Sequence, residues 1–364
     1  MIKVLIVEDS RVAQEFLAHI LTADPGIQVV GVVSDGADAL QAVQTMRPDV
    51  VTMDIHMPKM GGYEATRAIM ENAPTPIVIV SASTGAKDAD STFRAIEAGA
   101  LAVVLRPPGF GHPAHKSAVR ELVWTVKTMS EIKVVRRYTR EPRQYVPALA
   151  PVLPLSSESQ KPQVWAKKNP GAIQLIAMGA STGGPPVLHK ILSQLPPTLP
   201  VPILIVQHIA PGFVQGFVDW LGSSTKFPVQ IAAGGQQLLP GHAYVAPDGF
   251  HMGIESGLRI VLSSHAAENG LRPSVAHLFR TVAQVLGADA LGVLLTGMGR
   301  DGARELREMR DRGAVTIAQD ETSSVVHGMP GEAIKLDGAT FILSPTAIPA
   351  VLIELTMQTN RRHT

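Results

Sequence analysis

The chain alternates short β-branched runs with amphipathic stretches, and it does so in two separate regions. In the first region the runs lie at 3–7, 29–33, 50–53, 77–80 and 102–105, with helix-like segments such as 11–21 and 37–46 between them. In the second region they lie at 174–178, 202–206, 243–246, 258–262, 292–295 and 314–318, separated by helix-like stretches at 187–195, 275–286 and 303–312. This alternation is typical of a parallel sheet covered by helices on both faces. We therefore predict an α/β protein with two doubly wound parallel-sheet domains.

The segment between the two regions has a different composition. Residues 126–170 show no sustained periodicity, are rich in proline and serine, and carry nine basic and three acidic side chains. Such a composition is typical of an extended linker. With 364 residues in total, we predict one domain over 1–125, a basic, Pro-rich linker over 126–170 that acts as a solvated spacer, and a second domain over 171–360.

Several classes of protein are disfavoured by composition. No apolar run approaches the roughly 18 residues of a membrane span, and two acids follow closely on the amino terminus where a signal peptide needs apolar residues. We expect a cytoplasmic protein without membrane insertion. The absence of cysteine removes disulfides, cysteine zinc sites and a cysteine nucleophile.

Charged and polar residues follow the strands of the first region. Glu8 and Asp9 end the first run, Asp54 ends the third, Ser81 the fourth, and Arg106 follows the fifth. The carboxyl ends of parallel strands share one edge of a sheet. One acid there could merely cap a helix, but three converging carboxylates repel one another unless a cation such as Mg²⁺ joins them. With a hydroxyl and an arginine beside them, they predict a site for a phosphoryl group on a carboxylate.

These residues and their surroundings resemble a response-regulator receiver domain, which has a flavodoxin-like fold. The resemblance extends over Val-Glu8-Asp9-Ser, Met-Asp54-Ile-His-Met-Pro, Val-Ser81-Ala and Arg106-Pro. It implies that Asp54 accepts the phosphoryl group, that Glu8, Asp9 and Asp54 bind Mg²⁺, and that Ser81 and Arg106 form the phosphate switch. Arg106 replaces the usual lysine, and Val103 replaces the usual switch aromatic.

A glycine-rich turn follows the first strand of the second region, from Gly179 to Gly184. A dinucleotide loop is one interpretation, but Ser181 occupies the place where a pyrophosphate needs glycine, and no acid follows the next strand. A serine in a turn of small residues instead favours a nucleophile whose oxyanion is held by backbone amides.

A nucleophilic serine needs a base and an orienting acid. His208 follows the next strand and is expected beside Ser181. The alternatives are less suitable, because they lie in helix-like stretches or in expected loops: His189, His277, His251, His265 and His327. Asp301, in a glycine-rich turn after the strand at 292–295, is the candidate acid, although a helix cap is an equally simple interpretation of this residue.

The second region resembles the catalytic domain of the chemotaxis protein-glutamate methylesterases (CheB family), which has a Rossmann-like fold. The resemblance is carried by Gly-Ala-Ser181-Thr-Gly-Gly-Pro, Gln-His208, Arg-Pro-Ser and Thr-Gly-Met298-Gly-Arg-Asp301-Gly. It implies Ser181 as nucleophile, His208 as base, Asp301 as orienting acid, the Met298 amide as oxyanion donor and Thr182 in support, without a cofactor in this domain.

The two resemblances together imply one regulated enzyme. It would hydrolyse glutamate methyl esters, and deamidate glutamines in some members, on methyl-accepting chemoreceptors, under control of a histidine kinase that phosphorylates Asp54. The receiver would cover the catalytic cleft until then. A catalytically silent, phospho-regulated adaptor is the alternative. Nucleic-acid binding is disfavoured because residues 171–364 carry 13 basic and 14 acidic side chains.

Overall fold

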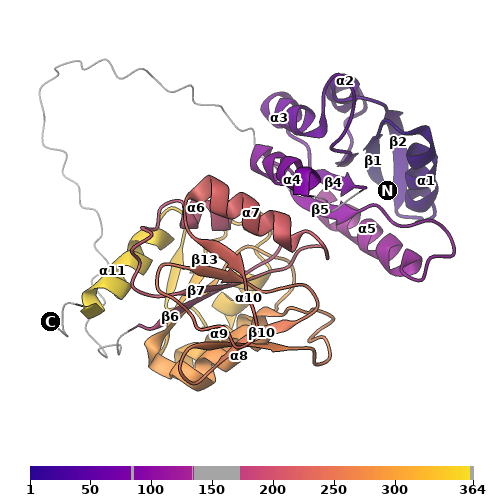
Figure 1. Cartoon of the computed structure of the whole chain (residues 1–364). Coiled ribbons are helices and arrows are strands. Elements are labelled where there is room, and N and C mark those ends of the chain that lie inside the picture. Colours follow the sequence, from indigo (N-terminus) through magenta and orange to yellow (C-terminus); the bar gives the residue numbers. More distant parts are fainter. Residues whose placement is uncertain (83–85, 133, 135–172, 361–364) are drawn as a thin grey trace, which may run out of the picture.

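The computed structural model describes residues 1–82, 86–132, 134 and 173–360, which form two α/β bodies (Figure 1). Most of the predicted linker lies outside the described residues. The last helix of the first body, α5 (His115–Ser130), runs past residue 125, the end predicted for that domain. None of the helices in the described ranges has the length and hydropathy of a membrane-spanning segment.

The first body is a five-stranded parallel sheet with the strand order β2-β1-β3-β4-β5. This is the flavodoxin-like order that we predicted. Its elements are β1 (Ile2–Val7), α1 (Arg11–Thr22), β2 (Ile27–Val33), α2 (Gly36–Met46), β3 (Val50–Met53), α3 (Gly62–Asn72), β4 (Ile77–Ser81), α4 (Ala86–Ala98), β5 (Ala102–Leu105) and α5. Ser10 and Asp35 cap α1 and α2 by accepting backbone N–H groups. The strands are continuous apolar runs because both faces of the sheet are covered.

The second body contains a seven-stranded parallel sheet with the order β14-β13-β12-β6-β7-β9-β8. Its elements are β6 (Leu175–Ala180), α6 (Gly184–Leu192), β7 (Ile203–Gln207), α7 (Val214–Thr225), β8 (Val229–Ile231), β9 (Ala243–Val245), β10 (His251–Glu255), β11 (Arg259–Ser263), α8 (Val275–Leu286), the short 3₁₀ helix η1 (Gly287–Asp289), β12 (Ala290–Leu294), α9 (Ala303–Asp311), β13 (Val315–Gln319), α10 (Met329–Lys335), β14 (Phe341–Leu343) and α11 (Ile348–Asn360). The predicted parallel, doubly wound sheet is confirmed.

One predicted strand of this sheet belongs elsewhere. The run at 258–262 forms β11, which pairs antiparallel with β10 in a separate two-stranded sheet. The strand prediction was right, but its place in the main sheet was wrong. A short turn at Gly257, with a positive φ, joins the two strands, so local hairpin pairing replaces a crossover. The sequence analysis missed β8, β10 and β14, two of which have three residues and little periodicity.

The two bodies meet where α4 of the first packs on α6 and α7 of the second (Figure 1). Phe93 of α4 is fully buried in the same apolar cluster as Phe217 and Trp220 of α7. Its ring stacks on Trp220 with centroids 5.3 Å apart and an angle of 18° between the planes. A buried aromatic of this size is typical of the anchor of an interface.

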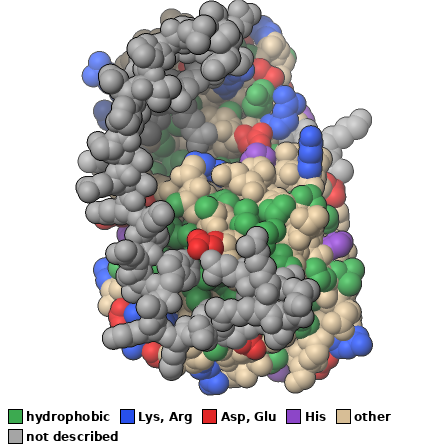
Figure 2. Space-filling view, turned by 90° about the vertical axis from the view of Figure 1, so that its left-hand side faces the viewer, with side chains coloured by type: hydrophobic (Ala, Val, Ile, Leu, Met, Phe, Trp, Pro, Cys, Tyr) green, Lys and Arg blue, Asp and Glu red, His purple; other side chains and the backbone are tan. Residues whose placement is uncertain are grey.

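The charges on one face of the molecule are mixed in sign. Figure 2 shows Lys and Arg side chains interspersed with Asp and Glu around scattered hydrophobic groups, outside the region that the grey residues cover. No continuous basic stripe is visible on the part of this face that the picture leaves open.

Candidate active site and phosphoacceptor site

Ser181 and His208 lie side by side at the carboxyl edge of the second sheet. β6 and β7 are parallel neighbours with Ala180 opposite Gln207, and the N–H of His208 donates to the carbonyl of Ala180 at 2.9 Å. The two candidate residues follow this register directly. Both line a cavity of about 440 Å³. The predicted adjacency of serine and histidine is therefore present in the fold.

Asp301 reaches the same histidine from the turn after β12. Its Oδ2 lies 3.0 Å from Nε2 of His208, and both side chains are largely buried. Among the described residues, Nε2 has no partner with hydrogen-bond alignment, so this contact is an ion-pair distance rather than an aligned hydrogen bond. Nδ1 is then the ring nitrogen left for a hydroxyl. The three residues of the predicted triad come from three neighbouring strand ends.

Asp301 also caps a helix, although not the one that follows it. The backbone N–H groups of Val275 and Ala276, at the start of α8, donate to Oδ2 and Oδ1 of Asp301 at 2.6 and 3.2 Å. Gly179 and Gly302 permit this approach, because a Cβ at either position would come within 2.4 Å of Val275. A helix N-terminus stabilises a carboxylate. The same carboxylate thus caps α8 and contacts the candidate base His208.

A third strand end supports the turn that carries the serine. The N–H of Ser181 donates to the carbonyl of Thr296 at 3.0 Å, and the hydroxyl of Thr296 donates to the carbonyl of Thr182 at 3.0 Å. The N–H of Met298 donates to no residue that the structure describes, and Met298 and Thr182 both line the cavity. An N–H without a partner beside the serine suits an oxyanion donor.

Gln207 is a site residue that the sequence analysis did not single out. Its Nε2 donates to the carbonyls of Ser181 and His208 at 2.9 and 2.7 Å, so it holds the nucleophile and base segments together. Gly184 leaves room for this side chain, since a Cβ there would lie 2.2 Å from Oε1 of Gln207. Its position next to His208 could have drawn attention to Gln207. A glutamine at the end of a strand, however, belongs to no spacing pattern that would predict a role in the site.

One of the competing histidines was misplaced by sequence reasoning. His251 is the first residue of β10 and is fully buried, whereas we expected a solvated loop. Its Nε2 lies 3.1 Å from the carbonyl of Ala266, and its ring stacks on His277, whose Nδ1 lies 3.3 Å from Glu268. Neither histidine lines the cavity that contains Ser181. Both have structural partners, and His208 remains the candidate base.

The three predicted acids of the first domain converge. Glu8, Asp9 and Asp54 each offer a carboxylate oxygen within 4.8 Å of the others. Glu8 and Asp54 are buried, and the N–H of His56 donates to Asp54 at 3.2 Å. Gly62 must lack a side chain, because a Cβ there would lie 2.2 Å from the Asp54 carbonyl. The α3 helix can therefore start directly beside the phosphoacceptor candidate.

The electrostatics of this cluster fit a bound cation. Burial, reinforced by the Asp54 carboxylate, raises the pKa of Glu8 to about 7, and burial also raises the pKa of Asp54. Both shifts arise first from burial, which disfavours the charged form of a carboxyl group, and a bound cation would favour that form. Arg106 Nη1 lies 3.4 Å from Glu8, which is a partial counter-charge. Oxygen donors at this spacing are those that Mg²⁺ prefers.

Ser81 and Arg106 stand at the ends of β4 and β5, as predicted. Ser81 is buried, and the N–H of Arg106 donates to its carbonyl at 2.8 Å. Val103, in the same edge strand, packs against the apolar cluster that contains Phe93 and the catalytic-domain aromatics. The position where an aromatic was expected is thus part of the contact between the domains.

The cavity at Ser181 is shared between the two domains. Its lining includes Val103 of β5 and Trp124 of α5, together with Ser181, Thr182 and His208. The β5 and α5 edge of the first domain thus lies over the nucleophile candidate.

Comparisons with known proteins find a family for each of the two domains. A family model described as CheB methylesterase matches residues 176–352, and a response regulator receiver domain model matches residues 4–111. A curated protein of Geobacter metallireducens, protein-glutamate methylesterase/protein-glutamine glutaminase 4, is 53% identical over 98% of this chain and 100% of its own length. This chain belongs to the CheB methylesterase family. The predicted family and enzyme class are confirmed.

Two further matches are a second curated protein with the same activities in its name and a crystal structure described as a CheB methylesterase domain. A curated protein of Syntrophus aciditrophicus, protein-glutamate methylesterase/protein-glutamine glutaminase 1, is 51% identical over 98% of this chain and 98% of its own length. The crystal structure of the Thermotoga maritima CheB methylesterase catalytic domain is 35% identical, with a TM-score of 0.49, and covers 50% of this chain and 98% of that one. The two curated relatives match along nearly the whole chain.

Gly297→Ala is expected to lower kcat for ester hydrolysis by about a hundredfold. A Cβ at this position would lie 2.7 Å from Cβ of Ser181 and 2.4 Å from Sδ of Met329, so the nucleophile must move by roughly 1 Å, a displacement that can cost about 10² in rate. Gly222→Ala in α7 is the control, because its Cβ would meet nothing within 4 Å. An unchanged kcat in Gly297→Ala would show that the close packing of the turn does not position Ser181.

Proposed function

We propose that this chain is a phosphorylation-regulated serine hydrolase that removes methyl esters from glutamate residues of methyl-accepting chemoreceptors and deamidates their glutamines. The observation that carries the proposal is the 3.0 Å contact between His208 and Asp301 beside Ser181, in a cavity that the receiver domain also lines. The relatives' names state both activities.

The chemistry follows from the positions of three side chains. The Ser181 hydroxyl attacks the ester carbonyl while His208 takes its proton, and the same histidine then protonates the departing methanol. Water next attacks the acyl-enzyme, with His208 again as base, and releases the glutamate. With a glutamine substrate the leaving group is ammonia. Asp301 orients the imidazole and stabilises its charged form.

Each attack produces an oxyanion that needs preorganised donors. The Met298 N–H has no partner among the described residues, and Thr182 adjoins the nucleophile. We assign Met298 as the oxyanion donor, with Thr182 supporting the turn. Loss of one such donor typically costs about 10² to 10³ in kcat, which is why the turn must be rigid.

Asp54 is the proposed phosphoacceptor. Glu8, Asp9 and Asp54 would hold Mg²⁺, which neutralises charge on the incoming phosphoryl group when bound. Ser81 and Arg106 would then contact the phosphoryl oxygens. Because they stand at the ends of β4 and β5, a change there would reach the β5 edge that lines the catalytic cavity. A chemotaxis histidine kinase is the proposed donor.

The position of the receiver domain at the cavity supports control of the esterase by movement of that domain away from Ser181. Receiver residues line the same cavity as Ser181, so phosphorylation would act by shifting a population from covered to uncovered molecules. Phosphorylation would then raise esterase activity by a finite factor, which is set by the free energy of docking between the receiver and the catalytic domain. A silent adaptor is not favoured, because all three candidate triad positions are filled and the relatives' names state both activities.

Mass spectrometry of methylated receptor helices tests the chemistry directly. Wild type is expected to convert γ-methyl glutamyl residues, and glutamines at the same kind of site, to glutamates, whereas Ser181→Ala converts neither. Stimulation by a small-molecule phosphodonor is expected to vanish when EDTA removes divalent cations, while basal hydrolysis continues. Receptor peptides that stay esterified with every variant and donor would overturn the proposal.

A further inference from the structure

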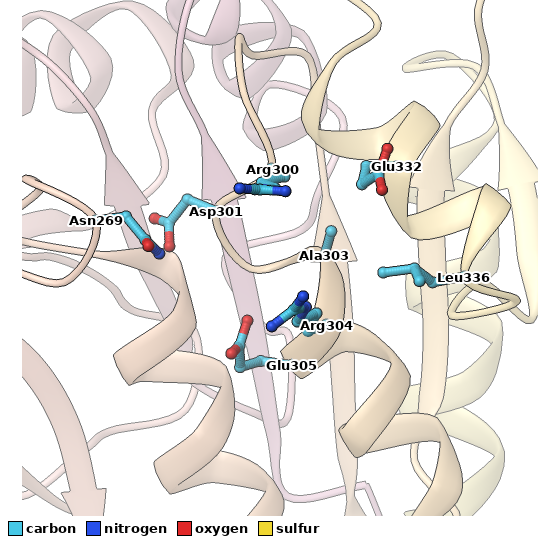
Figure 3. A pocket seen from close by; sticks show the side chains of 8 residues that line it. All are labelled: Asn269, Arg300, Asp301, Ala303, Arg304, Glu305, Glu332 and Leu336. Atoms are coloured by element: carbon cyan, nitrogen blue, oxygen red, sulfur yellow. The ribbon is translucent and has the colours of Figure 1, made fainter.

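A second pocket opens beside the catalytic site, in the second domain alone. It has a volume of about 170 Å³, which corresponds to the liquid volume of roughly five or six waters. Figure 3 shows Arg300 in the turn before α9 and Arg304 in its first helical turn, with Asp301 and Asn269 on one side and Glu332 on the other. Asn269 lines this pocket and the catalytic cavity, so the two are neighbours.

The acidic side chains of this pocket form ion pairs, whereas its two arginine side chains form none with the residues that the structure describes. Its acids already have partners: Asp301 contacts His208 and α8, Glu305 lies 3.7 Å from Arg280, and Glu332 lies 3.6 Å from Lys335. Burial also raises the pKa of Glu305.

The two arginines of the pocket differ from its acids. Arg300 and Arg304 are exposed, and among the described residues no ion pair or hydrogen bond is formed by either guanidinium group. They stand four residues apart at the start of a helix, where a carboxylate would also meet the favourable helix dipole. Two guanidinium groups without partners that face one small pocket are suited to bind a carboxylate, often in bidentate fashion.

We propose that Arg300 and Arg304 form a carboxylate-binding pocket that takes an acidic side chain of the receptor helix next to the ester being hydrolysed. The inference rests on the proposed function and names two specificity-determining residues for it. Each turnover leaves a glutamate on the receptor, so a segment with more than one methylation site presents carboxylates beside the remaining esters. A pocket for such a carboxylate, next to the nucleophile, would hold the receptor segment near Ser181 and so raise its affinity.

The position of the pocket adds a consequence for regulation. None of its lining residues belongs to the receiver domain. An acidic segment can therefore bind there while the receiver still covers Ser181. Recognition of the receptor and exposure of the nucleophile become separate steps.

Steady-state methanol release from methylated receptor membranes, with phosphodonor present, tests this pocket. Arg300→Gln and Arg304→Gln are each expected to raise KM about three- to tenfold, and the double variant about 10- to 100-fold. The value of kcat should stay unchanged. The lost charge-assisted hydrogen bonds would stabilise the bound substrate and the transition state equally. Arg304→Lys should retain part of the affinity. Arg312→Gln, which removes the same charge at the other end of α9, is the control.

A binding measurement separates the pocket from catalysis. A synthetic helical peptide with glutamates on successive turns should bind full-length Ser181→Ala, and adding the double arginine change should weaken binding by a similar factor and flatten its salt dependence. If the double variant matches wild type in KM and in peptide binding while release still requires Ser181, the carboxylate pocket is wrong and the esterase stands. If methanol release is absent throughout, the proposed function itself fails.

Discussion

Asp301→Asn is expected to lower kcat for ester hydrolysis by about 10⁴, the loss that follows when the orienting acid of a serine triad becomes an amide. Oδ2 of Asp301 lies 3.0 Å from Nε2 of His208, so the amide presents the wrong polarity to the imidazole and favours the wrong tautomer. Asp301 also lines the pocket proposed for a receptor carboxylate, so kcat rather than KM reports on its role in orienting His208.

The same change has a structural cost that must be measured separately. The amide retains one oxygen for the two N–H donors of Val275 and Ala276, so a modest fall in melting temperature is expected. Asp311→Asn, at the other end of α9, is the matched control, since Asp311 forms a surface ion pair with Arg307 and has no other ion pair among the described residues. A kcat within tenfold of wild type in a folded Asp301→Asn protein would remove Asp301 from the triad.

Phe93→Ala is the second change with a large expected effect, and it acts in the opposite direction. Phe93 is fully buried against Phe217 and Trp220 of the other domain, and truncating such a residue typically costs about 3–5 kcal/mol. Because those contacts exist only when the domains are docked, most of this cost falls on the covered state. Basal methanol release should rise about 10- to 100-fold, limited by the activity of the fully uncovered enzyme.

Two comparisons make this prediction specific. Phosphodonor should stimulate Phe93→Ala little further, since the covered population is already depleted. Phe110→Ala is the control, because Phe110 belongs to the same domain but is largely exposed and packs on Phe16 and His115. Unchanged basal activity in Phe93→Ala, with normal stimulation, would show that the α4 contact does not restrain the enzyme.

Much of the fold could be predicted because parallel sheets covered on both faces have a strong sequence pattern. Continuous apolar runs such as Ile77–Ser81 leave little ambiguity, and their polar successors, Glu8, Asp54 and His208, fall on the sheet edges that the pattern requires. β14 and β8 were missed because three-residue edge strands carry almost no periodicity. β11 was assigned to the wrong sheet because a run of alternating residues does not specify its pairing partner.

The candidate residues of the site could be predicted from the sequence, but the residues that hold them in place could not. Ser181, His208 and Asp301 follow strands, and small residues mark their turns. The roles of Gln207 and Val275 depend on side-chain contacts across strands, which no local spacing encodes. Phe93 has the helical period of an ordinary core residue, so its place between domains emerges only from tertiary packing. Binding of Mg²⁺ by Glu8, Asp9 and Asp54 and phosphorylation of Asp54 stay predictions.

The central claim is a Ser181-dependent esterase that the receiver domain restrains until Asp54 is phosphorylated. The most direct test is methanol release from methylated receptor membranes, with and without a small-molecule phosphodonor, for wild type, Ser181→Ala and Asp54→Asn. The account predicts stimulated release by wild type, basal release without stimulation by Asp54→Asn, and no release by Ser181→Ala. Release by Ser181→Ala equal to that of wild type, or undiminished stimulation of Asp54→Asn, would contradict it.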